Sequence, residues 1–238
     1  MSSTGPLGSA VIAPAGIKGF DADRPIAAFE AGAFVKAGYR FALRYVMRET
    51  PHQSDASRAE VTGLLAAGLA VMLVQHVEND PWIPSSAKGT LYGTNAAACA
   101  VACGIPLGVT VWLDLEGVDP HVPAGVVIAY CNTWFANVAD AGYTPGLYVG
   151  VGTRLSASQL YHALTVKAFW SAYNLNSDQV PAVRGVQMRQ HAVKPEEIPV
   201  GVDIDGQMMD TDTIMADAKG ETPTVCAPPG WLEALTAH

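Results

Sequence analysis

The chain carries little positive charge and has no long hydrophobic run. Its 238 residues include 14 Lys and Arg against 22 Asp and Glu, for a formal net charge of -8. Because phosphate backbones are bound by basic surfaces, this balance argues against nucleic acid as a partner. No apolar run reaches the roughly 18 residues of a membrane-spanning helix, so we expect no membrane span.

Several short motifs of common enzyme classes are also missing. The four cysteines form no CxxC pair, and the chain has no HExxH, P-loop or GxSxG sequence. We therefore expect neither a metal nor a cofactor. The first residues lack the basic and long apolar stretches of a Sec signal. This favours a protein that stays in the cytoplasm until it is released, or that is exported by a non-Sec route.

What the chain does contain is an alternation of strand-like and helix-like segments. Strands are expected at residues 17–22, 41–47, 69–77, 108–117, 145–151, 167–173, 185–191 and 201–208, and helices at 25–37, 56–67, 90–103, 124–141 and 156–164. Alternating strands and helices predict a parallel sheet, and eight such strands predict an α/β protein with a TIM-like barrel.

The last two connections of this barrel, residues 174–184 and 192–200, are short for a parallel crossover, which usually needs a dozen or more residues. We therefore expect about five regular βα units and an irregular closing section that allows antiparallel pairing. The chain then divides into a flexible N-terminal segment (1–16), the barrel (17–210) and a C-terminal tail or packing extension (211–238).

Carboxylates end three of the expected strands. Asp21 ends GIKGFD, Asp114 and Glu116 end VTVWLDLEG, and Asp203 and Asp205 end GVDID. Residues two apart on a strand face the same side, and strand–helix barrels carry their active sites at the carboxyl ends of the strands. These acids are therefore predicted to converge on one pocket, although turn-forming or capping roles would also explain each of them taken alone.

Rings and amides accompany these acids, as a carbohydrate site requires. The other strand ends carry Arg44 or Tyr45, Gln75 to Glu78, Tyr148, Trp170, Tyr173, Gln187 and Gln190. The predicted substrate-binding residues are Arg44, Gln75, Tyr148, Trp170, Tyr173, Gln190 and Asp205. Glycosidic cleavage needs a proton donor and a second group that stabilises the developing positive charge. When several carboxylates lie close together, the pKa of one of them is raised, so that it can act as the proton donor. We expect Glu116, with its longer side chain, to be the acid, and Asp114 to stay ionised.

The segments GFD, AGYRFALRYV, WLDLEG, GYTPGLYVG, FWSAYN, VQMRQH and VDID, in that order, resemble the glycoside-hydrolase-like barrels of domain-of-unknown-function family 1906. They are also similar to glycoside hydrolase family 25, the lysozymes of peptidoglycan, although GFDAD replaces the DVS-type run of those enzymes. The resemblance covers roughly residues 17–210. It implies Glu116 as general acid, Asp114 as the group that assists the substrate's acetamido group or stabilises a charged intermediate, and Asp21 and Asp203 as residues that polarise the site.

Two functions follow from this sequence. The first is a peptidoglycan hydrolase of lysozyme type, with a phage or prophage lysin as one form, whose partner is peptidoglycan or a related glycan. The alternative is a non-catalytic carbohydrate-binding barrel, whose carboxylates bind sugar hydroxyls or a calcium ion. A metal-dependent hydrolase that uses the aspartate cluster is a third, weaker hypothesis.

Overall fold

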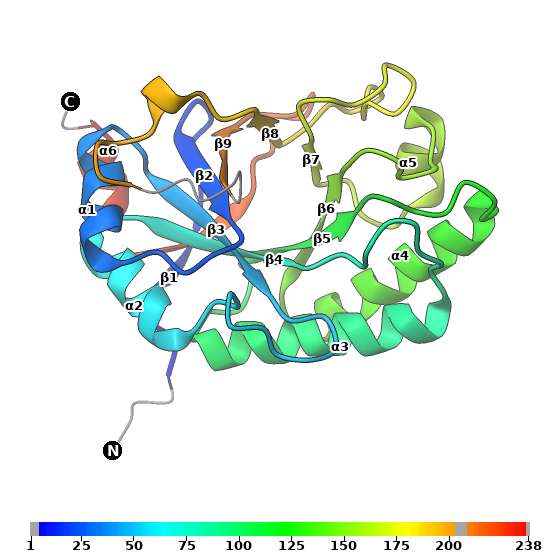
Figure 1. The fold of residues 1–238 in the computed structure, drawn as a ribbon, viewed down its shortest axis with the longest axis horizontal. Coiled ribbons are helices and arrows are strands. Elements are labelled where there is room, and N and C mark those ends of the chain that lie inside the picture. The colour runs from blue at the N-terminus through cyan, green and yellow to red at the C-terminus, as the bar shows by residue number, and fades with distance from the viewer. Residues whose placement is uncertain (1–4, 203–208, 237–238) are drawn as a thin grey trace.

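The computed structural model describes residues 5–202 and 209–236 of the chain. Its sheet is closed, because β4 pairs with β5 as well as with β3 (Figure 1). The eight strands of the barrel are β2 (Lys18–Ala22), β3 (Phe41–Val46), β4 (Ala70–Gln75), β5 (Thr110–Leu115), β6 (Thr144–Val149), β7 (Phe169–Ser171), β8 (Met188–His191) and β9 (Met209–Ile214). The predicted α/β class and TIM-like barrel are confirmed.

The strands from β2 to β8 run parallel to their neighbours, and β9 closes the barrel antiparallel to both β8 and β2. Five helices follow the first five barrel strands: α1 (Ala28–Lys36), α2 (Arg58–Ala67), α3 (Ser86–Cys103), α4 (Ala124–Asp140) and α5 (Ala157–Ala163). After β7 the described residues contain only a short 3-10 turn, Pro195–Glu197, before the barrel closes. The barrel thus has five regular βα units and an irregular closing section, as predicted.

Local sequence signals set the ends of these helices. The hydroxyls of Ser57 and Ser85 accept hydrogen bonds from the backbone N–H three residues on, which caps α2 and α3. Gly68 and Gly104 end the same helices with φ values of 100° and 78°, a conformation that glycine adopts without strain.

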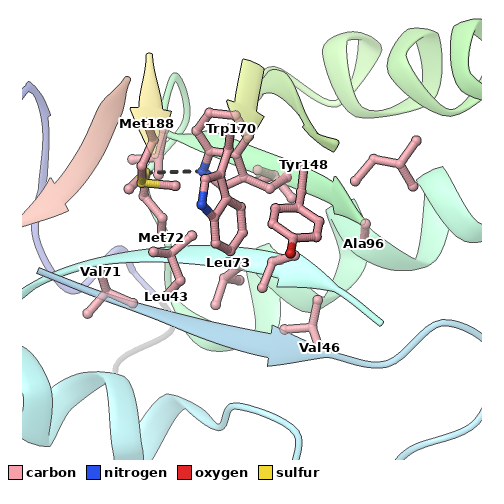
Figure 2. Close-up of a cluster of buried hydrophobic side chains, with 14 of the residues drawn as sticks. Leu43, Val46, Val71, Met72, Leu73, Ala96, Tyr148, Trp170 and Met188 are labelled. Carbon is pink, nitrogen blue, oxygen red and sulfur yellow. Dashed lines mark hydrogen bonds between the residues drawn. The ribbon is translucent and has the colours of Figure 1, made fainter. Parts of the chain in front are cut away.

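The interior of the barrel is filled by aromatic rings. The Trp112 and Trp170 ring centroids lie 6.0 Å apart, and Trp112 Nε1 donates to Met72 Sδ at 3.4 Å. Figure 2 shows Trp170, Tyr148, Met72 and Leu43 in one buried cluster. A Cβ on Gly146 would lie 2.5 Å from the Trp112 ring, so a glycine is needed there to make room for it. Trp170 is completely buried and forms the floor beneath the open end of the barrel.

Segments near both ends of the described residues pack onto the barrel. Strand β1 (Ser9–Ile12) pairs antiparallel with β10 (Thr224–Ala227), and β10 pairs with β4. Helix α6 (Trp231–Thr236) follows, and Trp231 Nε1 donates to the backbone oxygen of Arg40 at 3.0 Å. The segment predicted to be flexible, 1–16, therefore contains a strand, and the predicted boundary at residue 210 falls inside β9. No helix among the described residues is long and apolar enough to cross a membrane.

The closing strand differs from the prediction. Segment 201–208 was expected to be the eighth strand, but the position between β8 and β2 is occupied by 209–214. Residues 203–208, and with them Asp203 and Asp205, lie outside the described residues. Both stretches contain an Asp-x-Asp pair, so the same alternation pattern predicts a strand at either place.

Candidate active site

The open end of the barrel contains a groove made of two adjoining hollows. The first has a volume of about 390 Å³ and the second of about 340 Å³. Both are lined by Asp23, Tyr45 and Glu116, so the hollows meet at these side chains. The first hollow is further lined by Arg48, His52, His76, Glu78, Asn79 and Asp114. The second is further lined by Asp21, Tyr148, Tyr173, Asn174, Gln190 and Asp210.

Strand β5 brings Asp114 and Glu116 to this groove. Asp114 is opposite Tyr148 in the parallel register with β6, and it is 3% exposed. Glu116 follows the last residue of the strand, and its backbone oxygen accepts a hydrogen bond from Trp82 Nε1 at 2.6 Å. Because the two residues are two apart, both side chains face the groove. The predicted pairing of these acids in one pocket matches this arrangement.

A close approach of β6 determines where the Glu116 side chain lies. Gly150 N donates to the backbone oxygen of Leu115 at 3.0 Å. A Cβ on Gly150 would lie 2.5 Å from both Cβ and Oε2 of Glu116, which is far inside contact distance. The glycine therefore leaves the space that the carboxyl group of Glu116 occupies.

Burial dominates the electrostatics of these acids. Burial, followed by the charge of Asp80, raises the pKa of Glu116. Burial, followed by the charges of Glu116 and Asp21, raises the pKa of Asp114 well above its ordinary value. We expected Asp114 to stay ionised, whereas its complete enclosure favours the protonated form. Neighbouring carboxyls in this position cannot all be ionised together, so they share protons.

Asp21 belongs to the same cluster and is connected to the second hollow. Gln190 Nε2 donates to Asp21 Oδ2 at 3.1 Å, and Tyr148 OH donates to Gln190 Oε1 at 2.8 Å. Burial raises the pKa of Asp21 to about 7, although the Gln190 hydrogen bond acts in the opposite direction. The three residues were each predicted for the site, and the structure joins them in one hydrogen-bonded chain.

The closing strand contributes two acids that were not predicted. Asp210 is opposite Asp21 in the antiparallel register with β2, and it lines the second hollow. Burial raises its pKa to about 6. Asp212 is 1% exposed, and burial followed by the charge of Asp21 raises its pKa well above the ordinary value. The signal was the alternation in MDTDTI, which the similar GVDID pattern upstream obscured.

Two predicted substrate-binding residues face away from the groove. Arg44 is completely buried on the outer face of β3, where its Nε lies 2.6 Å from Glu60 Oε1. Gln75 is buried on the outer face of β4, where it donates to the backbone oxygen of Tyr92 at 2.8 Å. Successive side chains on a strand alternate between faces, so the next residues along the chain line the groove instead. They are Tyr45 and His76.

The two predicted aromatic contacts have different positions. Trp170 is enclosed in the core and reaches the groove only through Tyr148, whose ring centroid is 4.4 Å away. Tyr173 is 53% exposed and lines the second hollow. Only Tyr173 of this pair presents an open ring face to a ligand. Within the described part of the chain, no group of three or more His, Cys, Asp or Glu side chains is arranged to hold a metal ion.

The comparison with protein families assigns the chain to a family. Residues 32–207 match the model of the Rv2525c-like, glycoside hydrolase-like domain, and the chain belongs to this family. The predicted resemblance to glycoside-hydrolase-like barrels is thereby confirmed. No curated protein matches the chain.

Solved structures with the same fold include three of particular interest. An uncharacterized protein of B. stearothermophilus has a TM-score of 0.61 and 21% identity, over 86% of this chain and 97% of the other. The Tat-secreted protein Rv2525c of Mycobacterium tuberculosis has a TM-score of 0.59 and 16% identity, over 90% and 98%. A lysozyme from Streptomyces coelicolor has a TM-score of 0.57 and 15% identity, over 87% and 95%. At these identities the likeness establishes the fold.

Proposed function

We propose that the protein is a glycoside hydrolase that cleaves the glycan strands of peptidoglycan in the manner of a lysozyme, with Glu116 as its general acid. The observation that carries the proposal is the position of Glu116 where the two hollows meet, beside the buried Asp114. The lysozyme fold of the Streptomyces coelicolor protein supports it.

A glycan that extends through both hollows would pass over Glu116. Burial and the charge of Asp80 raise the pKa of Glu116, which favours a proton on the group that faces the ligand. Transfer of this proton to the glycosidic oxygen breaks the bond to the leaving sugar, and water completes the hydrolysis. Asp114 and Asp21 share protons beside it, so whichever of the two is ionised places a negative charge next to the developing positive charge on the sugar ring.

The remaining groove residues suit the binding of sugars. Tyr173 offers an exposed ring, and Tyr148, Gln190 and Asn174 offer hydrogen-bonding groups in the second hollow. Asp210 takes the place on the closing strand that we had expected Asp203 to fill, since it lines the groove opposite Asp21. Export by a non-Sec route is part of the same proposal, and the Tat-secreted relative supports it.

The test is the release of reducing ends from purified peptidoglycan by the wild-type protein and by Glu116→Gln. Loss of a general acid lowers rates by about 10² to 10⁴-fold, so we expect the variant to release few or no ends. Asp140→Asn, which changes an exposed acid on α4, is the matched control and should keep full activity.

Circular dichroism and urea unfolding should show Glu116→Gln to be folded. If neither the wild-type protein nor the variant releases reducing ends, and the folded protein still binds glycan saturably, the hydrolase proposal fails and the carbohydrate-binding barrel takes its place.

A further inference from the structure

The first hollow contains an arginine that is held in place by neutral groups. The backbone oxygen of Arg48 accepts a hydrogen bond from Asn95 Nδ2 of α3 at 2.8 Å. Its guanidinium group donates to the backbone oxygen of Val77, and its Cζ lies 5.6 Å from the centroid of the Tyr92 ring. These contacts fix the orientation of the guanidinium group without neutralising its charge.

Glu78, which also lines this hollow, forms an ion pair with Lys88, and His76 lies beside two carboxyl groups. Glu78 Oε1 lies 2.7 Å from Lys88 Nζ and accepts from Tyr92 OH at 2.9 Å. His76 Nε2 lies 3.2 Å from Asp55 Oδ1, with the Asp23 carboxylate at 3.5 Å.

Arg48 stands apart from these pairs. Among the described residues it takes part in no ion pair, and its Nε has no hydrogen-bond partner. A partly buried guanidinium group without a carboxylate is an incomplete arrangement, because burying an unpaired charge is costly.

The two hollows differ in whether they contain a cation. The described residues that line the second hollow include Asp21, Asp23, Glu116 and Asp210 but no Lys, Arg or His. Acids line the first hollow as well, but it also offers the donors of Arg48 together with the side chains of His52 and Asn79. An anionic ligand group therefore finds a positively charged partner in the first hollow and none in the second.

We propose that the first hollow binds a carboxylate carried by the glycan, with Arg48 as its main ligand, and that the second hollow binds an uncharged sugar. Arg–carboxylate pairs are frequently bidentate and are among the stronger hydrogen-bonded pairs in proteins. This inference rests on the proposed function and adds a direction to it, because a carboxylate-bearing unit can then occupy only one side of Glu116. The carboxylate belongs either to an N-acetylmuramic acid ring or to the peptide attached to it.

The experiment measures the affinity of the Glu116→Gln protein, by calorimetry, for three ligands. The first is a disaccharide of N-acetylglucosamine and N-acetylmuramic acid with a free carboxylate, and the second is the same disaccharide as its carboxamide. The third is the disaccharide with an amide-linked peptide, in which the carboxylates lie on the peptide. We expect about tenfold tighter binding of a charged ligand than of the carboxamide, and a smaller difference at high salt.

Variants in the same Glu116→Gln background test the role of Arg48. Arg48→Met should remove the preference, Arg48→Lys should keep part of it, and Arg189→Met, which removes an exposed cation on β8, should leave it unchanged. A preference for the free acid assigns the first hollow to the carboxylate of the ring, and a preference for the peptide ligand alone assigns it to the peptide.

Two negative results are distinguishable. Equal affinity for all three ligands in the Glu116→Gln parent would overturn the carboxylate site and leave the hydrolase proposal standing. Absence of binding to any of them, together with no release of reducing ends by the wild-type protein, would overturn the proposed function itself. The comparison of ligands in the parent does not depend on whether Arg48→Met folds.

Discussion

The inner and outer faces of the barrel wall carry polar side chains of two different kinds. On the outer face, Arg44 donates to Glu60 and to the backbone oxygens of Ala22 and Ser54, so its donors are occupied. On the inner face, Asp114 Oδ1 has no hydrogen-bond partner among the described residues, and Asp212 is buried beside the carboxyl group of Asp21. The outer group is buried beside an opposite charge, whereas the inner groups are buried beside other acids.

This difference distinguishes polar groups that stabilise the fold from polar groups that are available for function. A buried polar group without a partner costs stability, so its presence at the open end of a barrel calls for an explanation. Ligand binding supplies one, because a bound sugar or a transferred proton would complete the missing interaction. The two faces should therefore respond in opposite ways to substitution, as the following predictions state.

The largest effect is expected on the outer face. Arg44→Met should lower the free energy of unfolding by about 3–5 kcal/mol, because it leaves the Glu60 carboxylate buried without its cation. Urea unfolding measures this loss. Activity per folded molecule should be unchanged, since Arg44 contacts neither hollow.

A double variant provides the internal control. Arg44→Met with Glu60→Met removes both charges, and it should be less destabilised than the sum of the two single variants. Additive losses would mean that the pair is not a unit. If folded Arg44→Met binds the substrate more weakly than wild type, Arg44 contributes to substrate binding, as the sequence predicted.

Arg44 also shows how far the sequence could predict this molecule. The five βα units were predictable because helix stops such as Gly68 and Gly104 separate strongly apolar strands, which are independent local signals. The acids of β5 were predictable for the same reason, since a single Asp-x-Glu pair ends that strand. Arg44 and Gln75 were assigned to the wrong face because they were chosen only for their position near the end of a strand. Side chains alternate between the two faces of a strand, and this alternation was not followed outward from the buried core residues.

The closing strand was missed for a different reason. A helix follows each of the first five strands, but no α-helix lies among the described residues between β7 and β9. Two Asp-x-Asp stretches follow β8, and local pattern does not decide between them. The choice of 209–214 depends on pairing with β2, which is almost the whole barrel away in sequence. Pairing between such distant segments leaves no local trace in the chain.

The inner face should show the opposite response to neutralisation. The folded state binds the Asp212 proton more tightly than the unfolded chain does, because burial raises its pKa well above the ordinary value of 3.8. Stability that depends on this proton is present at low pH and is lost as the pH rises through the folded-state pKa. Asp212→Asn removes that dependence. Its free energy of unfolding, relative to wild type, should rise with pH above the ordinary pKa of 3.8, by at most about 1.4 kcal/mol for each pH unit.

Urea unfolding at several pH values measures this change. Asp140→Asn, on the exposed surface of α4, is the matched control. A flat difference between wild type and Asp212→Asn across the same range would contradict the raised pKa of Asp212, and the contrast between the two faces would then be weaker than the burial of this carboxyl group suggests.

The smallest effect tests the space around Glu116 rather than its charge. Gly150→Ala places a Cβ 2.5 Å from both Cβ and Oε2 of Glu116, so the side chain of Glu116 must move. We expect about a tenfold lower rate of reducing-end release, which corresponds to about 1.4 kcal/mol, and a shifted pH profile, because the displaced acid loses part of its enclosure. Gly63→Ala in α2 is the matched control, since a Cβ there meets nothing within 4 Å. It should keep full activity and gain roughly 0.5–1 kcal/mol of stability. Full activity in Gly150→Ala would mean that proton transfer does not require Glu116 in this position.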